Sequence, residues 1–198
     1  MPFLTASTRA RTWLGRSRFP AWPVMSAMAF LGSASASAQI TASKEHQVKS
    51  VFLFNFAQFV EWPSDAFADA QKPLIIGVLG DDPFGAYLDD TVRGEKVNGR
   101  PLAVERFRKM EDVKTCHILF ISRSETARLK QHLEGLKSRI TLTVAETDEF
   151  CRRGGMIQFV TEKGKIRLKI NVEAAKAAHL KISSKLLRAA EIVGTGNN

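Results

Sequence analysis

Long apolar runs are scarce in this chain of 198 residues. The first one, Ala21 to Leu31, has about 11 residues, too few to cross a bilayer core of roughly 30 Å. No later run reaches the length of about 18 residues that a membrane-spanning helix needs. The sequence therefore predicts no transmembrane segment in the mature chain.

Cysteine is also scarce, with only Cys116 and Cys151 in the whole chain. Cys116 should start a central strand, whereas Cys151 precedes a strand that lies further along the predicted sheet. Two strand spacings of roughly 4.8 Å exceed the distance of about 7 Å between Cα atoms that a disulfide can bridge. We therefore expect both thiols to be free, even in an oxidising compartment.

The usual motifs of catalysis and metal binding are missing. The histidines lie in different predicted elements and have no second ligand at metal-binding spacing. No Gly-x-Ser-x-Gly elbow occurs, and residues 80–85 lack the glycine spacing and the Lys-Ser/Thr pair of a phosphate loop. Cys116 adjoins His117, but neighbouring strand residues point to opposite faces. These absences predict a protein that is not an enzyme and holds no metal or cofactor.

The first 38 residues have the pattern of a secretory signal peptide. They carry several arginines and no acid, followed by the short apolar run and by Ala36-Ser37-Ala38, an A-x-A cleavage site. We predict cleavage after Ala38 and export to a periplasm. The remaining 198 − 38 = 160 residues, 39–198, fit a single domain.

The basic charge of the chain does not indicate nucleic-acid binding. The formal net charge is +9, but four of the 29 basic residues are signal-peptide arginines, which leaves 25 against 20 acids, or +5. The basic residues are scattered, apart from a stripe along one predicted strand, for which a solvated strand face is the simpler interpretation. The stripe consists of Lys163, Lys165, Arg167 and Lys169.

The segment from Glu45 to Pro63 is the organising element of the predicted fold. Its apolar residues occupy most of the helix circumference, so we expect a buried helix that Pro63 ends. Continuous apolar runs predict buried strands at 74–79 and 118–121. A partly exposed strand is expected at 102–107, a further strand at 140–144, and a β-hairpin at 156–161 and 165–170. Helices are expected after Asp82, with Pro83 first, then from Ser124, after Asn171, and from Ser183 through Ile192.

This alternation of strands and helices predicts an α/β three-layer sandwich. Its sheet should be mostly parallel, with about six strands and an antiparallel hairpin at one edge. In such sheets, ligands bind beyond the carboxyl ends of the strands, where the strand order reverses. The candidate crevice residues there are Asp81, Asp82, Ser122 and Ser124. The simpler interpretation is that Asp82 caps a helix while Asp81 is solvated.

Several separated stretches resemble the YfiR-like periplasmic regulators. They are residues 54–63 (FNFAQFVEWP), 79–85 (LGDDPFG), 153–157 (RGGMI), 169–171 (KIN) and 180–187 (LKISSKLL), in the order of that family. The resemblance covers Lys44 to Val193. It implies a non-enzymatic repressor of an inner-membrane diguanylate cyclase, itself sequestered by an outer-membrane lipoprotein. Some relatives carry Cys where this chain has Gly77, opposite the position of Cys116. The resemblance therefore implies a disulfide that this chain cannot form, because the partner of Cys116 is missing.

The loop Arg152-Arg153-Gly154-Gly155 is the candidate partner-binding site. Its glycines permit backbone conformations that other residues avoid, and two guanidinium groups can grip a carboxylate or a phosphate. A strand entry with solvated arginines is the alternative interpretation. The sequence thus predicts a periplasmic regulator that binds an inner-membrane diguanylate cyclase or sensor kinase, with a homodimer left open. The alternative function is a periplasmic small-ligand binder that uses the crevice at the strand ends.

Overall fold

The computed structural model describes residues 33–67, 69, 71–194 and 196. The helices are α1 (Ser33–Phe59), α2 (Ala86–Val92), α3 (Leu129–Leu136), α4 (Val172–Ala177) and α5 (Ser184–Arg188), with 3-10 turns η1 (Ser64–Ala66), η2 (Met110–Asp112) and η3 (Arg123–Arg128). The strands are β1 (Val60–Glu61), β2 (Leu74–Leu79), β3 (Lys96–Val97), β4 (Arg100–Phe107), β5 (Ile118–Ile121), β6 (Leu142–Ala145), β7 (Ile157–Glu162), β8 (Lys165–Ile170), β9 (Lys181–Ile182) and β10 (Glu191–Ile192). Most of the predicted signal peptide lies outside the described residues, so its cleavage stays a prediction.

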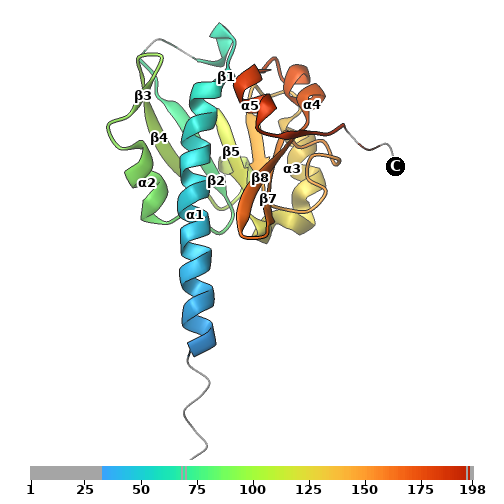
Figure 1. Ribbon diagram of the computed structural model, residues 1–198. Coiled ribbons are helices and arrows are strands. Elements are labelled where there is room, and N and C mark those ends of the chain that lie inside the picture. Colours follow the sequence, from blue (N-terminus) through green and yellow to red (C-terminus); the bar gives the residue numbers. More distant parts are fainter. Residues whose placement is uncertain (1–32, 68, 70, 195, 197–198) are drawn as a thin grey trace, which may run out of the picture.

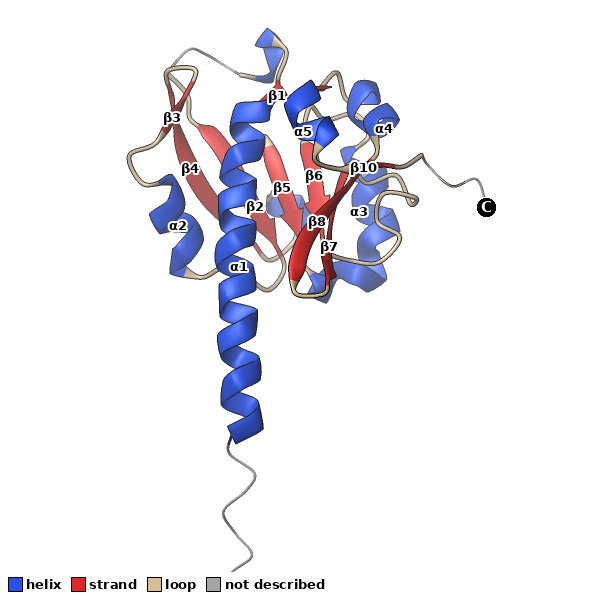
Figure 2. Ribbon diagram, in the orientation of Figure 1, coloured by secondary structure: helices blue, strands red, loops and turns tan. Residues whose placement is uncertain are grey.

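The main sheet has eight strands in the order β10-β8-β7-β6-β5-β2-β4-β3 (Figure 2). Its central strands β4, β2, β5, β6 and β7 are parallel, whereas the β7–β8 hairpin and the β3–β4 pair are antiparallel. The predicted α/β class and mostly parallel sheet are confirmed. The two strands beyond the expected six are β3 and β10, each of two residues, too short to leave an apolar pattern in the sequence.

Strands β2, β5 and β6 are buried on both faces, which explains why they contain so few exposed residues. Alternate residues such as Ile76 and Val78 join a core under α1 and α2, whereas Leu119 and Ile121 join a second core under α3. Figure 1 shows α1 lying across one face of the sheet and α3 behind the other. The three layers follow from this two-sided burial.

Helix α1 is buried along one stripe only. Leu53, Phe56 and Ala57 recur at helical spacing and are at most 1% exposed. On the opposite side, Val48 and Val51 are 47% and 49% exposed. The expectation of a helix buried all round was therefore wrong, because the second side of α1 has no layer above it.

The predicted end of this helix at Pro63 was also wrong. α1 ends at Phe59, because Val60 pairs antiparallel with Ile182 in the small β1–β9 sheet. The Ser183 amide then donates to the Phe59 carbonyl at 2.8 Å. This small sheet ties the start of the domain to its C-terminal part.

The helix predicted to start at Pro83 begins three residues later. Gly85, at φ +53°, is the residue before α2, and the Asp82 carboxylate accepts from the Phe84 amide at 2.8 Å in a turn instead.

The predicted cap of α4 at Asn171 is confirmed, since the Asn171 side chain accepts from the Ala174 amide at 3.0 Å.

The last helix also differs from its prediction. Its expected start is confirmed, because the Ser183 side chain caps α5. α5 ends at Arg188 instead of continuing through Ile192, which pairs with β8 as part of β10.

Candidate functional site

The strand order reverses between β2 and β5, and the predicted crevice residues do come together there. β4 lies on one side of β2 and β5 on the other, so residues 80–82 and 122–124 follow neighbouring parallel strands. The Asp81 amide donates to Ser124 Oγ at 3.0 Å, and the Ser122 amide donates to the Leu79 carbonyl at 3.0 Å. The sequence-based placement of Asp81, Ser122 and Ser124 thus describes one contiguous edge.

This edge is filled by its own side chains. A Cβ atom added to Gly80, at φ +89°, would lie 2.4 Å from Ser124 Oγ and 2.9 Å from Glu125 Cγ. Ser122 is buried, and Asp81 is exposed. Cavities are found elsewhere, beside the β7–β8 hairpin and the 148–152 loop. The side chains of Ser124 and Glu125 therefore occupy the space beside Gly80.

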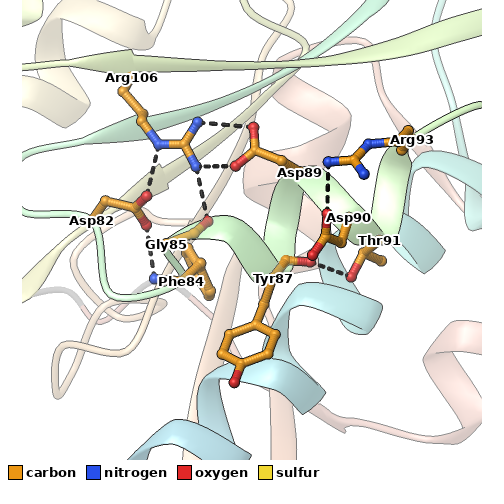
Figure 3. Close-up of polar contacts among 9 residues, drawn as sticks. All are labelled: Asp82, Phe84, Gly85, Tyr87, Asp89, Asp90, Thr91, Arg93 and Arg106. Carbon is orange, nitrogen blue, oxygen red and sulfur yellow. Dashed lines mark hydrogen bonds and ion pairs between the residues drawn. The ribbon is translucent and has the colours of Figure 1, made fainter.

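Asp82 is engaged in an ion-pair cluster around Arg106 of β4 (Figure 3). Arg106 Nε donates to Asp82 Oδ2 at 2.7 Å, and Arg106 Nη2 donates to Asp89 Oδ2 at 2.6 Å and to the Gly85 carbonyl at 3.0 Å. Asp82 and Asp89 flank the start of α2, which this guanidinium group fastens to the sheet. Asp82 therefore serves the attachment of α2.

The charges of this cluster stabilise one another. The hydrogen bonds from Arg106 hold the pKa of the Asp89 carboxyl below its ordinary value. In return, the hydrogen bond to Asp89 raises the pKa of Arg106 despite its partial burial. Arg106 is 38% exposed, so water and salt reach the pair and limit its strength.

The Arg152-Arg153 loop projects two exposed guanidinium groups from a well-anchored backbone. Arg152 Nε lies 3.4 Å from Glu149 Oε2, within a loose surface pair. The loop is held from below by Phe150, which is fully buried, and a Cβ atom on Gly155 would lie 2.2 Å from that ring. Gly154 has φ +98°, which a side chain disfavours. The two glycines thus allow a rigid turn around a buried ring.

Further backbone bonds fix this loop between distant parts of the chain. Asn171 Nδ2 donates to the Cys151 carbonyl at 2.9 Å, and the Gly196 amide donates to the Arg152 carbonyl at 3.0 Å. A cavity of about 160 Å³ opens beside the loop, between Glu149 and Arg152 on one side and Val160 and Lys169 on the other. A backbone that is held by several hydrogen bonds and carries exposed side chains is an arrangement that suits recognition.

A buried ion cluster on α1 escaped the sequence analysis. Lys49 is 1% exposed; its Nζ pairs with Glu45 Oε1 at 2.5 Å and with Glu146, and it lies 5.8 Å from the centre of the Phe159 ring. Arg123 pairs with the other oxygen of Glu146 at 3.1 Å. The sequence did contain an indication that Lys49 is buried, because Lys49 lies four residues before Leu53, on the buried stripe of α1.

The charges of this cluster also reach β7. Glu45 Oε1 accepts from the Thr161 hydroxyl at 2.8 Å. Burial alone raises the pKa of Glu45, but the hydrogen bonds from Lys49 and Thr161 outweigh it and leave that pKa below its ordinary value. The cluster therefore holds α1 to the carboxyl end of β6 and to β7.

A second buried pair, also missed, joins Glu125 and His132. His132 Nε2 lies 2.8 Å from Glu125 Oε2, and Arg128 reaches the other carboxylate oxygen at 3.2 Å. Among the described residues, no hydroxyl or thiol bonds to His132, and its Nδ1 has no partner. The neighbouring Ser124 instead accepts from a backbone amide, so a Ser-His-Glu triad is not assembled.

Both cysteines are free and buried, in agreement with the expectation of free thiols. Burial raises the pKa of each thiol to about 12, which keeps them protonated and unreactive. A Cβ atom on Gly77 would lie 2.7 Å from Cys116 Sγ, so Gly77 does face this cysteine. The neighbouring His117 points the other way: its Nδ1 accepts from the Ile75 amide at 3.0 Å.

His117 fills a structural position. Its Nε2 bonds to the Ala66 carbonyl at 3.1 Å, and its ring stacks on Phe67 with centroids 4.4 Å apart. The guanidinium carbon of Arg100 also lies over the Phe67 ring, 3.9 Å from its centre. Because Nδ1 accepts a hydrogen bond, Nε2 carries the proton and the ring is neutral. Burial lowers the pKa of His117 and favours this form.

The protein is an α/β sandwich in which the ion clusters around Lys49 and Arg106 attach helices to the sheet. In the described part of the chain, no group of three potential ligands is placed to hold a metal ion, and no helix is long and apolar enough to cross a membrane. The chain belongs to the YfiR/HmsC-like family, whose model matches residues 46–191. That family is involved in the regulation of diguanylate cyclase signalling.

Comparisons with other known proteins add little to the family assignment. No curated protein matches the chain. Among solved structures, it is similar to a conserved domain protein from Vibrio cholerae O1 biovar El Tor strain N16961, with 14% identity and a TM-score of 0.42. That match covers 60% of this chain and 54% of the other, so the chain spans about half the length of that protein.

Proposed function

We propose that this protein is an exported periplasmic regulator that binds and represses an inner-membrane signalling enzyme. A diguanylate cyclase is the first partner to test, and a sensor kinase the second. Membership of the YfiR/HmsC-like family supports this function, as does the pattern of an N-terminal signal peptide. An outer-membrane lipoprotein that sequesters the regulator, and a homodimer, are further parts of this proposal.

The observation that carries the proposal is the anchored loop of Arg152 and Arg153. Both side chains are exposed, whereas the backbone between Phe150 and Gly155 is fixed by a buried ring and by bonds to Asn171 and Gly196. A rigid loop loses little entropy on binding, and arginine is enriched at interface hot spots. This loop can therefore present two cations to acidic groups of a partner.

A regulator without a catalytic site acts by binding one state of its partner better than another. A differential affinity of about 1 to 3 kcal/mol between two states of the enzyme gives a useful response. Only a few contacts need to differ between those states. Two desolvated arginine–carboxylate pairs are sufficient for such a difference.

The test is a double variant, Arg152→Ala with Arg153→Ala. It should keep the wild-type melting temperature, because both side chains lie in solvent, and lose co-purification with the membrane-bound enzyme. A matched control, Arg93→Ala with Arg108→Ala, removes two exposed arginines elsewhere and should bind normally. If the Arg152 and Arg153 variant binds and represses like wild type, the two arginines are only solvated residues before a strand and take no part in partner binding.

The alternative function, a small-ligand binder at the crevice, has weaker support. Asp82 is occupied by Arg106, and Gly80 leaves no room beside Ser124. Isothermal titration against metabolites distinguishes the two functions. Heat of binding that is lost in an Asp81→Ala variant would favour the crevice, and unaltered partner binding in that variant favours the regulator.

A further inference from the structure

The outer edge of β8 is only partly covered. β10 pairs in parallel with Lys169 and Ile170, the last two residues of β8. In the described part of the chain, no strand lies beside residues 165–168 on that side. Figure 2 shows the β7–β8 hairpin extending well past the short β10. The sheet therefore ends on an open stretch of strand.

Backbone groups of this stretch face outwards. The Asn171 amide bonds inwards to the Met156 carbonyl at 2.8 Å, whereas the Ile170 carbonyl bonds outwards, accepting from the Val193 amide at 2.9 Å. Because bonding direction alternates along a strand, Ile166 also directs its amide and carbonyl away from β7. No described strand pairs with these groups, and they are of the kind that an added strand satisfies.

Cationic side chains line the same stretch. Lys165 and Arg167 alternate with core-facing Ile166 and Leu168, so both lie on one face of the sheet. Both are exposed, and neither has an ion pair within the described residues. Lys169, the next cation on this face, pairs with Glu191 of β10 at 3.5 Å. Thus β10 already places an acid opposite one cation of the stripe.

Concave surface accompanies the edge. A depression of about 490 Å³ lies along the hairpin tip, lined by Glu162 and by three cations, Lys163, Lys165 and Arg167. A second one, of about 420 Å³, lies between β8 and the segment from α5 to β10; its lining includes the cations Arg167, Lys169 and Arg188 and the acids Glu162 and Glu191. Both depressions share Arg167 and Glu162 in their linings. An extended chain placed there would pass between cations from two elements.

We propose that the edge of β8 at residues 165–168 binds an extended acidic segment of a protein partner by strand addition. The segment would continue the line of β10, its backbone pairing with Ile166 and its acidic side chains lying opposite Lys165 and Arg167. Such pairing takes affinity from backbone bonds and specificity from alternate side chains. The proposal concerns a surface separate from the Arg152-Arg153 loop and does not depend on it.

Two other occupants fit the observations less well. A second copy of this chain, pairing edge to edge, would bring Lys165 and Arg167 against the same cations, and like charges opposite each other on a sheet are destabilising. An anionic lipid surface or a free phosphate would satisfy the cations but not the backbone of Ile166. Only a peptide uses the charge and the open edge together.

The test uses the exported protein and a fluorescein-labelled hexapeptide of alternating glutamate and valine, followed by fluorescence anisotropy. Binding should weaken with added salt, and a lysine–valine peptide should not bind. The double variant Lys165→Glu, Arg167→Glu should lose at least about tenfold in affinity, equivalent to 1.4 kcal/mol. Unchanged affinity in that variant, or equal binding of the lysine peptide, would overturn the proposal.

A second pair of variants isolates the backbone contact. Ile166→Pro removes the outward amide without breaking the bonds to β7, and Ile166→Ala removes the same side-chain packing but keeps the amide. The proline variant should bind at least about tenfold more weakly than the alanine variant. Equal affinities mean that the site is only an electrostatic patch, and strand addition is rejected.

Amide hydrogen exchange covers the case in which Ile166→Pro does not fold. In the wild-type protein, the Ile166 amide should exchange more slowly when the glutamate peptide is bound. No added protection there would overturn strand addition. Binding to phosphatidylglycerol vesicles that the peptide cannot displace would assign the stripe to a membrane surface instead.

Discussion

Two ion clusters fasten helices to the same face of this sheet, and they differ in their access to water. Lys49 of α1 is 1% exposed and bridges Glu45 and Glu146, whereas Arg106 of β4 is 38% exposed and bridges Asp82 and Asp89. Each has one cation between two carboxylates. The two clusters have similar contact distances but differ in solvent exposure, so comparing them shows how exposure alone changes the strength of an ion pair.

The environment decides what each cluster contributes. In the buried cluster, removing one partner leaves an uncompensated charge away from water, which typically costs about 3 to 5 kcal/mol. In the exposed cluster, water replaces the missing partner, and pairs of this kind contribute roughly 0.2 to 1 kcal/mol. Similar contact distances therefore correspond to very different energies.

The largest effect should come from the apolar contact next to the buried cluster. Phe56 is fully buried, and its ring stacks on Phe159 with centroids 5.8 Å apart. We predict that Phe56→Ala lowers the free energy of unfolding by about 3 to 5 kcal/mol through lost burial and a cavity. Urea denaturation measures this loss, with Val51→Ala on the exposed side of α1 as the control. Near-wild-type stability would contradict the placement of α1.

Lys49→Ala should come next and should test the buried cluster directly. It leaves Glu146 with Arg123 alone and opens space against Phe159, so we expect a loss of about 3 kcal/mol. Lys49→Met fills the space without the charge and should recover part of that loss. If both variants were as stable as wild type, the burial of Lys49 would have no energetic role.

Arg106→Ala should have a smaller and salt-dependent effect. Loss of its bonds to Asp82 and Asp89 should cost about 1 kcal/mol at low ionic strength, and less when salt screens the pairs. The control is Arg93→Ala, which removes a more exposed pair with Asp90 and should cost less. A cost for Arg106→Ala that is as large as that for Lys49→Ala would remove the contrast between the clusters.

The smallest effect should be that of pH on stability between about pH 7 and 5. Neither ion cluster contains a histidine, so we expect this pH dependence to come from His117 and not from the clusters. Burial lowers the pKa of His117 in the folded protein. As the pH falls, His117 is therefore protonated at a higher pH in the unfolded chain than in the folded protein. The contribution of neutral His117 to the free energy of unfolding is complete above about pH 6.5 and is lost as the pH falls below that value. We expect His117→Gln to flatten the pH dependence of stability between about pH 7 and 5, where histidine titrates.

The sequence predicted those parts of the fold in which local pattern and burial agree. Continuous apolar runs located β2 and β5, and Asn171 located the start of α4. Pairing over long distances was not predictable in this way. Val60 leaves the helix because it meets Ile182, and β10 forms because β8 offers it an edge.

The candidate site shows the same division. Asp81 and Ser124 were placed together because parallel strands end at one edge. The role of Asp82 depended on Arg106, 24 residues away, which no local pattern links to it. Lys49 was missed because a lysine is usually solvated, and only its position on the apolar stripe of α1 indicated otherwise.

The position of α1 in the chain also has a consequence for how the protein reaches its folded state. Lys49 and Glu146 are 97 residues apart, and Glu45 and Thr161 are 116 residues apart. During synthesis or threading from the N-terminus, the phenylalanine-rich helix emerges long before β6 and β7 arrive to cover it. Such distant contacts slow folding and leave apolar surface uncovered meanwhile. The domain can therefore complete its fold only after residues 146–161 are available to cover α1.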